Sequence, residues 1–332
     1  VLPTISSVSL NAANTELTVT FAENVYDTDG GSGDLEAADF ALSKSNGVAT
    51  VASTPTGINK TADNIWVLDV NISGTADGNE LLAVVPAAGN AIYDASGNAA
   101  STTQSNNTAS LTEKVLPTIS SVSLNAANSE LTVTFSENVY NTNGGSGDLE
   151  VADFALSISG GAAGVNATPA SITKTAQNIW VLGLTLTGGT ANGSETLTVN
   201  PAAGTAIYDK AGNAASTSQS NNTASLTEKI LPTITDVTST TGNGSYKQGQ
   251  TIAITVEFSE AVNVDESGGT PTLTLNNTSG TNPAVDYSSG SGSTTLTFNY
   301  TIGSGETSGD LDYATTSSLV LNSGTIKDAA LN

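Results

Sequence analysis

The sequence predicts an all-β fold in which three antiparallel β-sandwich domains follow one another in a linear, rod-like array. Apolar residues recur at every second position in short segments separated by Gly, Asn and Pro, which is typical of half-buried antiparallel strands. Long segments also recur along the chain, whose 332 residues suffice for about three all-β modules.

The repeats fix the size of each unit. VLPTISSVSLNAAN begins at Val1 and again at Val115, and a related ILPTITDV begins at Ile230. SNNTASLTEK closes the first two repeats. The period of about 114 residues is that of an immunoglobulin-like (Ig-like) sandwich and far exceeds that of solenoid repeats. We therefore expect Ig-like domains at residues 1–114, 115–229 and 230–332.

The first repeat shows the strand pattern most clearly. Segments 16–21 and 64–73 alternate between apolar and polar residues, and segments 5–10 and 108–112 open and close the unit. Trp66 falls on the apolar face of its segment, so we expect it, like Trp180 in the second repeat, to lie in the core and not on a sugar-binding platform. One short helical turn is expected at residues 34–39.

The third repeat differs in its loops. It keeps alternating strands at residues 250–258, 273–275 and 296–302, but it has neither the acidic loop of the first two repeats nor a tryptophan. Its sequence ends at Asn332, where the other repeats still have a closing strand. We therefore expect that strand to be missing or supplied by further chain, and the sequence to be part of a longer protein.

The joints between repeats are short and contain proline. Residues 114–117 read KVLP and residues 229–232 read KILP, which leaves almost no free linker. Proline fixes its own φ and restricts the residue before it. We expect such joints to hold neighbouring repeats in a line.

The composition excludes several classes of function. The net charge is −23, from 31 acidic and 8 basic residues, so nucleic acids and anionic membrane surfaces are not expected partners. The chain has no Cys, Met or His, which excludes thiol or imidazole catalysis and zinc sites with sulfur or nitrogen ligands. No segment reaches the ~20 apolar residues that span a bilayer, so direct membrane insertion is not expected. Carboxylate oxygens instead suit hard cations such as Ca²⁺.

An acidic loop is the first candidate calcium site. Residues 23–40 read ENVYDTDGGSGDLEAADF, and residues 137–154 read ENVYNTNGGSGDLEVADF. Ca²⁺ takes six to eight oxygens, which clustered carboxylates and turned backbone carbonyls can supply. The spacing is not that of an EF-hand, and a solvated polar hairpin loop is the alternative. The candidates are Glu23, Asp27, Asp29, Asp34, Glu36 and Asp39 in the first repeat, and Glu137, Asn141, Asn143, Asp148, Glu150 and Asp153 in the second.

Comparison of the two loops separates a retained set from a variable pair. Glu23, Asp34, Glu36 and Asp39 recur as acids, whereas Asn141 and Asn143 replace Asp27 and Asp29. Asn offers a carbonyl oxygen without the charge. We expect the retained set to form the site and the variable pair to tune its affinity, with weaker binding in the second repeat.

A second motif recurs near the end of each repeat. The segment Asp-x-x-Gly-Asn follows a tyrosine at Asp94 and Asp209, and a related Asp328 stands in the third repeat. An ordinary β-turn explains the motif equally well. The functional alternative is that these aspartates reach the ion of the acidic loop or lie at the joint to a neighbouring unit. Glu260, Asp310 and Asp312 are the third repeat's own candidates.

These motifs also carry a family resemblance. FAENVYDTDGGSGDLEAADF and IYDxxGNAAS resemble the Ig-like repeats of very large bacterial surface proteins related to the cyanobacterial swimming protein SwmB. ITVEFSEAVNV and SGDLDYATTSSLVLNSGTIKDAA resemble the Ig-like repeats of RTX-type adhesins. The resemblance implies calcium-stiffened tandem domains exported to the bacterial surface, with calcium at Glu23, Asp34, Asp39 and Asp94, at their second-repeat equivalents, and at Glu260, Asp310 and Asp312.

The sequence therefore predicts a calcium-stiffened extender region of a secreted or cell-surface bacterial adhesin or extracellular filament protein. Its expected partners are the neighbouring repeats of the same chain, with self-association or a surface glycan or protein ligand as further partners. The alternatives are a ligand-binding module, with the third repeat as the binding unit, and a non-catalytic accessory region of a secreted enzyme. No catalytic residues are expected, because paired carboxylates that recur once per repeat suit an architectural site better than a glycosidase centre.

Overall fold

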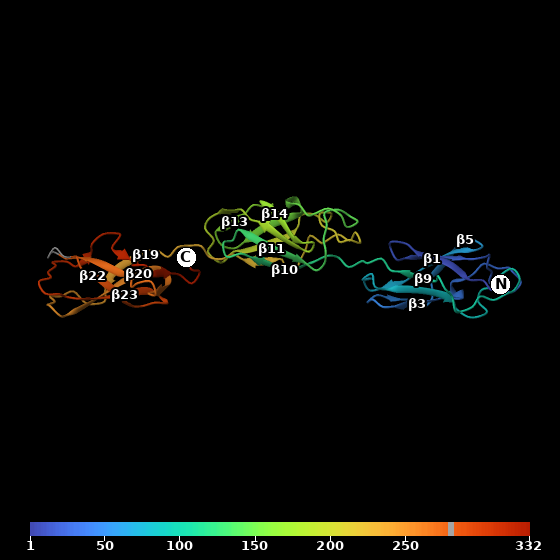
Figure 1. Cartoon of the computed structure of the whole chain (residues 1–332), viewed down its shortest axis with the longest axis horizontal. Helices are drawn as coiled ribbons and strands as arrows, with labels where there is room; N and C mark the ends of the chain where they lie inside the picture. Colours follow the sequence, from blue (N-terminus) through green and yellow to red (C-terminus); the bar gives the residue numbers. More distant parts are fainter. Residues whose placement is uncertain (278–281) are drawn as a thin grey trace.

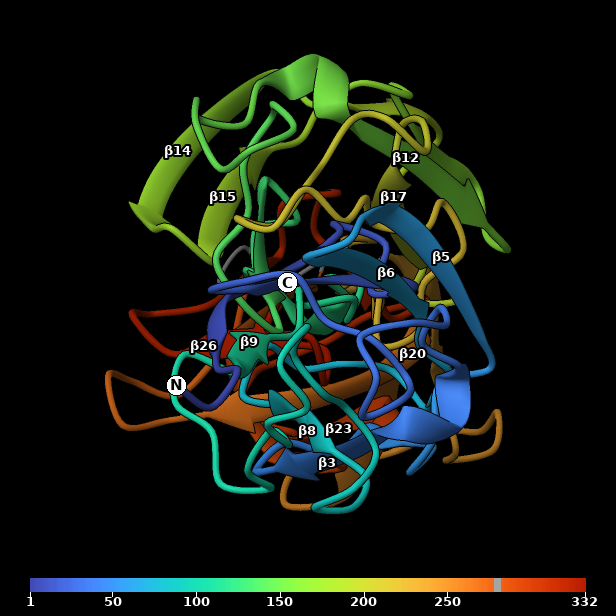
Figure 2. The ribbon, with the colours of Figure 1, turned by 90° about the vertical axis from the view of Figure 1, so that its right-hand side faces the viewer.

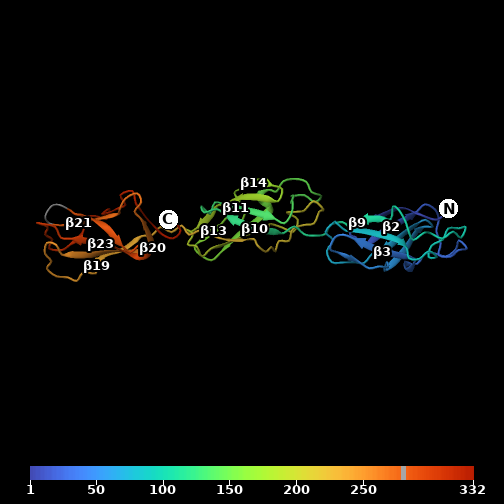
Figure 3. The same ribbon diagram turned by 60° about the horizontal axis from the view of Figure 1, so that its bottom comes forward.

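The computed structural model describes residues 1–277 and 282–332 and consists of three β-rich units arranged end to end. The units lie in line in two views that differ by 60° (Figures 1 and 3). Seen along the rod, they overlap without coinciding, so the array is slightly staggered (Figure 2). The predicted all-β fold with antiparallel sheets is confirmed.

Each unit has a hydrophobic core of its own. The three cores draw their buried residues from 5–111, 119–226 and 254–300, so each lies inside one predicted domain. The domain boundaries themselves stay predictions.

The first unit is a sandwich of two main sheets, ordered β1-β2-β6-β5 and β3-β8-β9, with a small pair β4-β7. Phe21 of the first sheet and Phe40 of the second pack across the core with ring centroids 6.3 Å apart. The strands are β1 Ile5–Leu10, β2 Glu16–Phe21, β3 Phe40–Ser45, β4 Thr50–Val51, β5 Gly57–Ala62, β6 Ile65–Asp69, β7 Ile72–Ser73, β8 Leu81–Pro86 and β9 Thr108–Ser110.

Trp66 is 1% exposed in this core, as its alternation predicts. The single strand predicted at residues 64–73 is wrong in one respect, because it consists of β6 and β7. The chain leaves the first sheet at Val70, whose N–H donates to the carbonyl of Thr15, and then pairs with β4.

The second unit repeats this arrangement, with sheets β10-β11-β15-β14 and β12-β17-β18 and the pair β13-β16. Its strands are β10 Ile119–Leu124, β11 Glu130–Phe135, β12 Phe154–Ser159, β13 Ala163–Val165, β14 Ser171–Ala176, β15 Ile179–Gly183, β16 Leu186–Gly188, β17 Thr196–Pro201 and β18 Thr223–Ser225. The helical turn predicted in the acidic loop is one turn of 3₁₀ helix in each unit, η1 Ala37–Asp39 and η2 Val151–Asp153.

The third unit curls one sheet, ordered β19-β20-β23-β22-β21-β24, around its core, with β25 beside β21 and β26 beside β20. The predicted strand at residues 250–258 continues seven residues further, and its last three residues, 263–265, pair with β26. The strands are β19 Ile234–Ser239, β20 Thr251–Asp265, β21 Thr272–Asn276, β22 Ala284–Ser289, β23 Ser293–Thr301, β24 Asp312–Tyr313, β25 Leu319–Val320 and β26 Thr325–Lys327.

The closing strands β9 and β18 carry the chain to the next unit. β9 pairs with β8 and lies against β1, and Leu111 directly after it is buried. Asn14, in the turn between β1 and β2, then holds Thr112 through two hydrogen bonds: its Nδ2 donates to the Thr112 carbonyl at 2.7 Å and its Oδ1 accepts from the Thr112 N–H at 2.8 Å. Asn128 binds Thr227 in the same way in the second unit. The residue that follows each clamped threonine is therefore held at the joint.

Candidate metal centres at the joints

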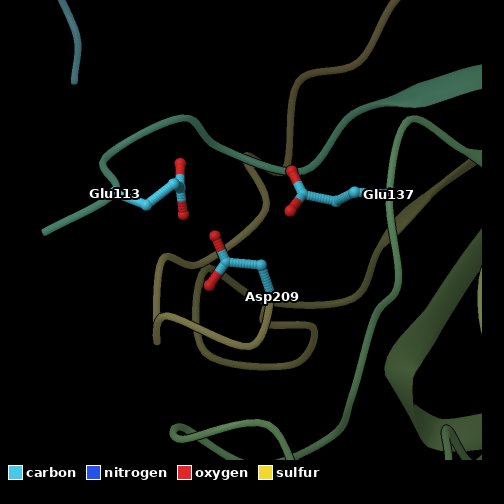
Figure 4. Close-up of side chains that lie close together, drawn as sticks. All are labelled: Glu113, Glu137 and Asp209. Carbon is cyan, nitrogen blue, oxygen red and sulfur yellow. The ribbon is translucent and has the colours of Figure 1, made fainter. Parts of the chain in front are cut away.

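Two clusters of three carboxylates lie where one unit meets the next. The first consists of Glu113, Glu137 and Asp209, whose carboxylates point toward one another (Figure 4). The second consists of Glu228, Glu260 and Asp328. In each cluster, one oxygen from every residue lies within 4.8 Å of those of the other two. The two clusters are equivalent, since each takes one glutamate from the end of a unit and two acids from the unit that follows.

The first glutamate of each cluster is positioned by the closing strand. Glu113 follows the clamped Thr112, and the N–H of Lys114 donates to the carbonyl of Ala76 at 2.8 Å. The equivalent bond in the second unit joins Lys229 to Ala191 at 2.8 Å. Backbone bonds on both sides thus hold the glutamate at the end of its own unit.

The other two acids come from loops that pair with each other. Glu137 lies two residues beyond β11, and the loop that it begins pairs with the Asp209 turn through two backbone hydrogen bonds between Tyr140 and Tyr208, at 2.7 and 2.8 Å. In the third unit, Glu260 and Asp328 have the same relation, because β20 continues past Glu260 and pairs with β26 just before Asp328. The acidic loop and the aspartate turn, identified separately in the sequence, are therefore neighbours.

An asparagine ties each cluster together across the joint. The Nδ2 of Asn213 donates to Glu113 Oε2 and to Asp209 Oδ2, both at 2.7 Å. Asn332 does the same for Glu228 at 2.7 Å and Asp328 at 2.9 Å. The Gly-Asn part of the turn motif thus contributes a donor that contacts both units.

The clusters have electrostatic properties that favour uptake of a positive charge. Asp209 and Asp328 are almost fully buried. Burial, the hydrogen bond with Asp209 and the nearby charges of Asp209 and Glu137 raise the pKa of Glu113 to about 7. Burial and the charge of Asp209 raise the pKa of Glu137. Burial and the charges of the other two acids raise the pKa of Glu260 in the second cluster. Each cluster therefore favours a proton or a bound cation over three free carboxylates.

The donor set fits calcium. Three carboxylates offer up to six oxygens, and Ca²⁺ takes six to eight at flexible geometry. The nearby backbone includes carbonyls that can complete such a shell, since the Asn213 amide already bonds the Glu113 carbonyl at 3.3 Å. Soft ligands are absent, because the chain has no Cys, Met or His.

The remaining acids of the acidic loop have other contacts. Asp34 pairs with Lys60 and Asp148 pairs with Lys174, at 2.6 Å in the second case. The two lysines lie over the rings of Trp66 and Trp180 at 5.3 and 5.6 Å from the centroids. The aspartates predicted as calcium ligands thus have a cationic partner.

The acids that follow in this loop cap the 3₁₀ turn. The N–H of Glu36 donates to Asp39 Oδ2 at 2.7 Å, and Glu150 and Asp153 repeat this bond. Burial raises the pKa of Asp39, as do the charges of Asp27 and Glu36. In the described residues these acids form no cluster of three within the 4.8 Å limit that the joint clusters meet. A calcium site built from them stays a prediction.

The second member of the variable pair, Asp29 or Asn143, lies against the aspartate turn. A Cβ on Gly97, at φ +80°, would come within 2.6 Å of the backbone carbonyl oxygen of Asp29, and a Cβ on Gly212 would collide with the side-chain Oδ1 of Asn143. This close approach accounts for the glycine of the turn motif. The Oδ1 of Asn141 is buried and has no hydrogen-bond partner among the residues that the structure describes.

Four further candidates lie outside the joint clusters. Glu23 and Asp94 occupy in the first unit the positions of Glu137 and Asp209. Hydrogen bonds from the Asn98 side chain and backbone hold the pKa of Asp94 below its usual range. Asp310 and Asp312 line a groove of the third unit.

Sequence reasoning missed the glutamate that each joint takes from the preceding unit, Glu113 and Glu228. The signal was present, because both stand at the same place in the recurring segment SNNTASLTEK. Each repeat taken by itself does not reveal this glutamate, since the other two acids of the cluster belong to the next repeat.

Comparison with protein-family models gives a match in the third unit. Residues 228–332 match the family model of the bacterial Ig-like domain. A search of curated proteins finds no match to the chain. The match supports the predicted Ig-like repeat for this part of the chain, whereas the SwmB-related and RTX-adhesin subtypes stay predictions.

Domains of this family are typical of bacterial surface proteins, where they serve as structural or binding modules, and they are typically non-catalytic. Within residues 1–277 and 282–332, no helix has the length and apolar character needed to cross a membrane.

Proposed function

We propose that the chain is a structural extender region of a bacterial cell-surface adhesin or extracellular filament protein, in which calcium ions stiffen the joints between units. The observation that carries this proposal is the three-carboxylate cluster that spans each joint, built twice from equivalent residues. A cation bound there joins the end of one unit to two loops of the next. Both joints would then be fixed in the in-line arrangement.

The need for a cation follows from what else holds the joint. Val115 and Leu116 of the first linker are 40% and 48% exposed, and Ile230 and Leu231 of the second are 44% and 67% exposed. The linkers therefore contribute little apolar packing between units. The asparagine of each cluster supplies hydrogen bonds across the joint, from Asn213 to Glu113 and from Asn332 to Glu228.

The repulsion within a cluster is large enough to matter. Two carboxylates at the 4.8 Å limit repel each other by about 3 kcal/mol at an effective dielectric constant of about 20. Swinging the units apart relieves the part of this repulsion that involves the glutamate of the preceding unit, so a cluster without a cation favours a bent or mobile joint. A divalent cation reverses the sign of the interaction and favours the closed joint.

Calcium titration of the chelator-treated chain tests this proposal. We expect Glu113→Gln and Glu228→Gln each to lower the number of bound calcium ions by one, measured by isothermal titration calorimetry. Glu130→Gln removes an exposed carboxylate that belongs to neither cluster and should leave the number unchanged. Magnesium should compete poorly, because it requires near-ideal octahedral geometry and dehydrates reluctantly. An unchanged number of bound ions in both joint variants would refute the proposal.

A further inference from the structure

We infer that Asn213 and Asn332 are positioning residues of the joint clusters: each aligns two carboxylates from different units and thereby sets how tightly the joint holds a cation. The inference rests on the proposed function, because it concerns the same two clusters. It goes beyond that proposal by assigning the cation affinity of each joint to a side chain that bears no charge.

The turn that contains each asparagine fixes its orientation. The backbone N–H of Asn213 donates to Asp209 Oδ1 at 2.8 Å, and its Nδ2 donates to Asp209 Oδ2 at 2.7 Å. In the first unit, Asn98 makes the same two bonds to Asp94, at 2.8 and 2.7 Å. Asn98 contacts no joint glutamate in the part of the chain that the structure describes, so the turn alone suffices to orient this side chain.

The second N–H of the same NH₂ group reaches the preceding unit. Asn213 Nδ2 lies 2.7 Å from Glu113 Oε2, and Asn332 Nδ2 lies 2.7 Å from Glu228 Oε2. An amide NH₂ has two N–H donors and carboxylate oxygens only accept, so one donor serves each acid. A single planar group therefore holds one acid of each unit, and both joints use this arrangement.

These bonds leave two of the three carboxylates aligned for a cation. Glu113 Oε1 accepts from the N–H of Val115, so both oxygens of Glu113 and both oxygens of Asp209 accept hydrogen bonds. A carboxylate has about four lone-pair sites, so each oxygen keeps one for a metal ion. Carboxylates that bind metals are commonly held by such outer hydrogen bonds, which fix the orientation of the ligand.

The neutrality of the asparagine keeps the charge of the cluster available. In the acidic loops, Asp34 and Asp148 pair with Lys60 and Lys174, whose positive charges offset theirs. Among residues 1–277 and 282–332, no lysine forms a salt bridge with an acid of a joint cluster. A neutral donor orients the joint acids without offsetting their charge, which remains to attract a cation.

Calorimetric titration of the full chain with Ca²⁺ tests this role. The background variant Glu228→Gln should remove the ion of the second joint, so that the ion that depends on Glu113 can be followed. In this background, Asn213→Ala should keep that ion but raise its dissociation constant by about 10- to 100-fold, the usual effect of removing the outer partner of a metal ligand.

Asn98→Ala is the matched control. It removes the same two hydrogen bonds from the turn of the first unit, but it contacts no joint glutamate in the described residues. We expect it to leave the dissociation constant of the joint unchanged. A loss of affinity confined to Asn213→Ala therefore reports the contact across the joint and not the stability of the turn.

Asn213→Asp separates positioning from charge. This variant keeps the shape of the side chain, adds a negative charge and removes both N–H donors of the amide. If charge alone governed the affinity, it would bind Ca²⁺ more tightly, because more ligand charge raises calcium affinity. The positioning role predicts weaker binding, because a carboxylate can donate to neither Glu113 nor Asp209 and repels both.

Two results would overturn the inference. One is a dissociation constant for Asn213→Ala within about twofold of that for Asn98→Ala, and the other is tighter binding by Asn213→Asp. In both cases an ion that depends on Glu113 is still bound, so the proposed function would stand without the inference. If Glu113→Gln removes no ion from the unaltered chain, the proposed function fails and the inference fails with it.

Discussion

Replacing Glu80 by Gln is expected to lower the free energy of unfolding of the first unit substantially, although Glu80 lies in no candidate metal site. This side chain is fully buried, and its carboxylate joins two loops. Oε1 accepts hydrogen bonds from the N–H groups of Val48 and Ala49 at 3.0 and 2.9 Å, and Oε2 accepts from those of Asp77 and Gly78, both at 3.1 Å. We call this arrangement the carboxylate clamp; Glu195 forms its counterpart in the second unit.

The magnitude follows from the geometry of the clamp. A glutamine keeps one carbonyl oxygen but turns an NH₂ group toward two backbone N–H donors. Two charge-assisted hydrogen bonds are lost, which costs about 3 kcal/mol at about 1.5 kcal/mol each, and two buried donors are left unpaired. Against a typical domain stability of about 5–15 kcal/mol, the first unit loses a substantial fraction of its stability.

The clamp also predicts the pH dependence. Burial alone would raise the pKa of Glu80, but hydrogen bonds from backbone N–H groups, including those of Ala49 and Asp77, outweigh it and lower this pKa to about 2. Because this pKa is lowered, the clamp contributes stability above the ordinary glutamate pKa of 4.5, and that stability is lost as the pH falls toward 2. The Gln variant should lose stability less steeply over this range.

Urea unfolding followed by tryptophan fluorescence measures both effects. The chain has two tryptophans, so Trp180→Phe leaves Trp66 as the reporter of the first unit. In this background, Glu80→Gln is compared at pH 7 and pH 3 with Glu16→Gln, the same change at an exposed position of the same unit. If Glu80→Gln costs no more free energy of unfolding than Glu16→Gln, the clamp does not stabilise the unit and our reasoning is wrong.

Three further predictions concern the second unit and the first joint. Gly161→Ala should lower the free energy of unfolding of the second unit by about 2 kcal/mol in urea, because a Cβ there would collide with Glu195 and the backbone φ is +56°. Gly204→Ala, in open space, should be nearly neutral, and equal costs for the two variants would contradict this prediction. Lys174→Met should cost less than about 1 kcal/mol in the same assay, because its partner Asp148 is 64% exposed; a loss above about 1 kcal/mol would refute it. Calcium affinity at the first joint should fall up to tenfold per pH unit below about 7, because the raised pKa of Glu113 lets a proton compete with the cation for its carboxylate. Calorimetric affinities that stay constant from pH 8 to pH 6 would contradict this prediction.

Much of the fold follows from local pattern. Alternation placed Trp66 in the core, and the repeat period gave the size of the units. The pattern could not show that the strand predicted at residues 64–73 changes sheet at Val70, because a side chain there faces the core in either case.

The candidate site was harder to predict because its parts are far apart in the sequence. The sequence indicated Glu137 and Asp209 as separate motifs, and their contact depends on a pairing between two loops of one unit. Glu113 could not be joined to them without knowing which end of one unit meets the next. The role of Glu80 was not predicted from the sequence, because its hydrogen-bond partners are backbone N–H groups, which every residue type except proline provides.

The central claim, that calcium fixes the joints, is tested most directly by small-angle X-ray scattering of the full chain with calcium and with chelator. Three units of about 40 Å each, from strands that rise about 3.3 Å per residue plus loops, give a rod of about 120 Å. We predict this rod profile in calcium and a shorter, broader distribution of distances in chelator. The double variant Glu113→Gln, Glu228→Gln should give the chelator profile under both conditions. Superimposable curves for the unaltered chain with and without calcium would contradict the account.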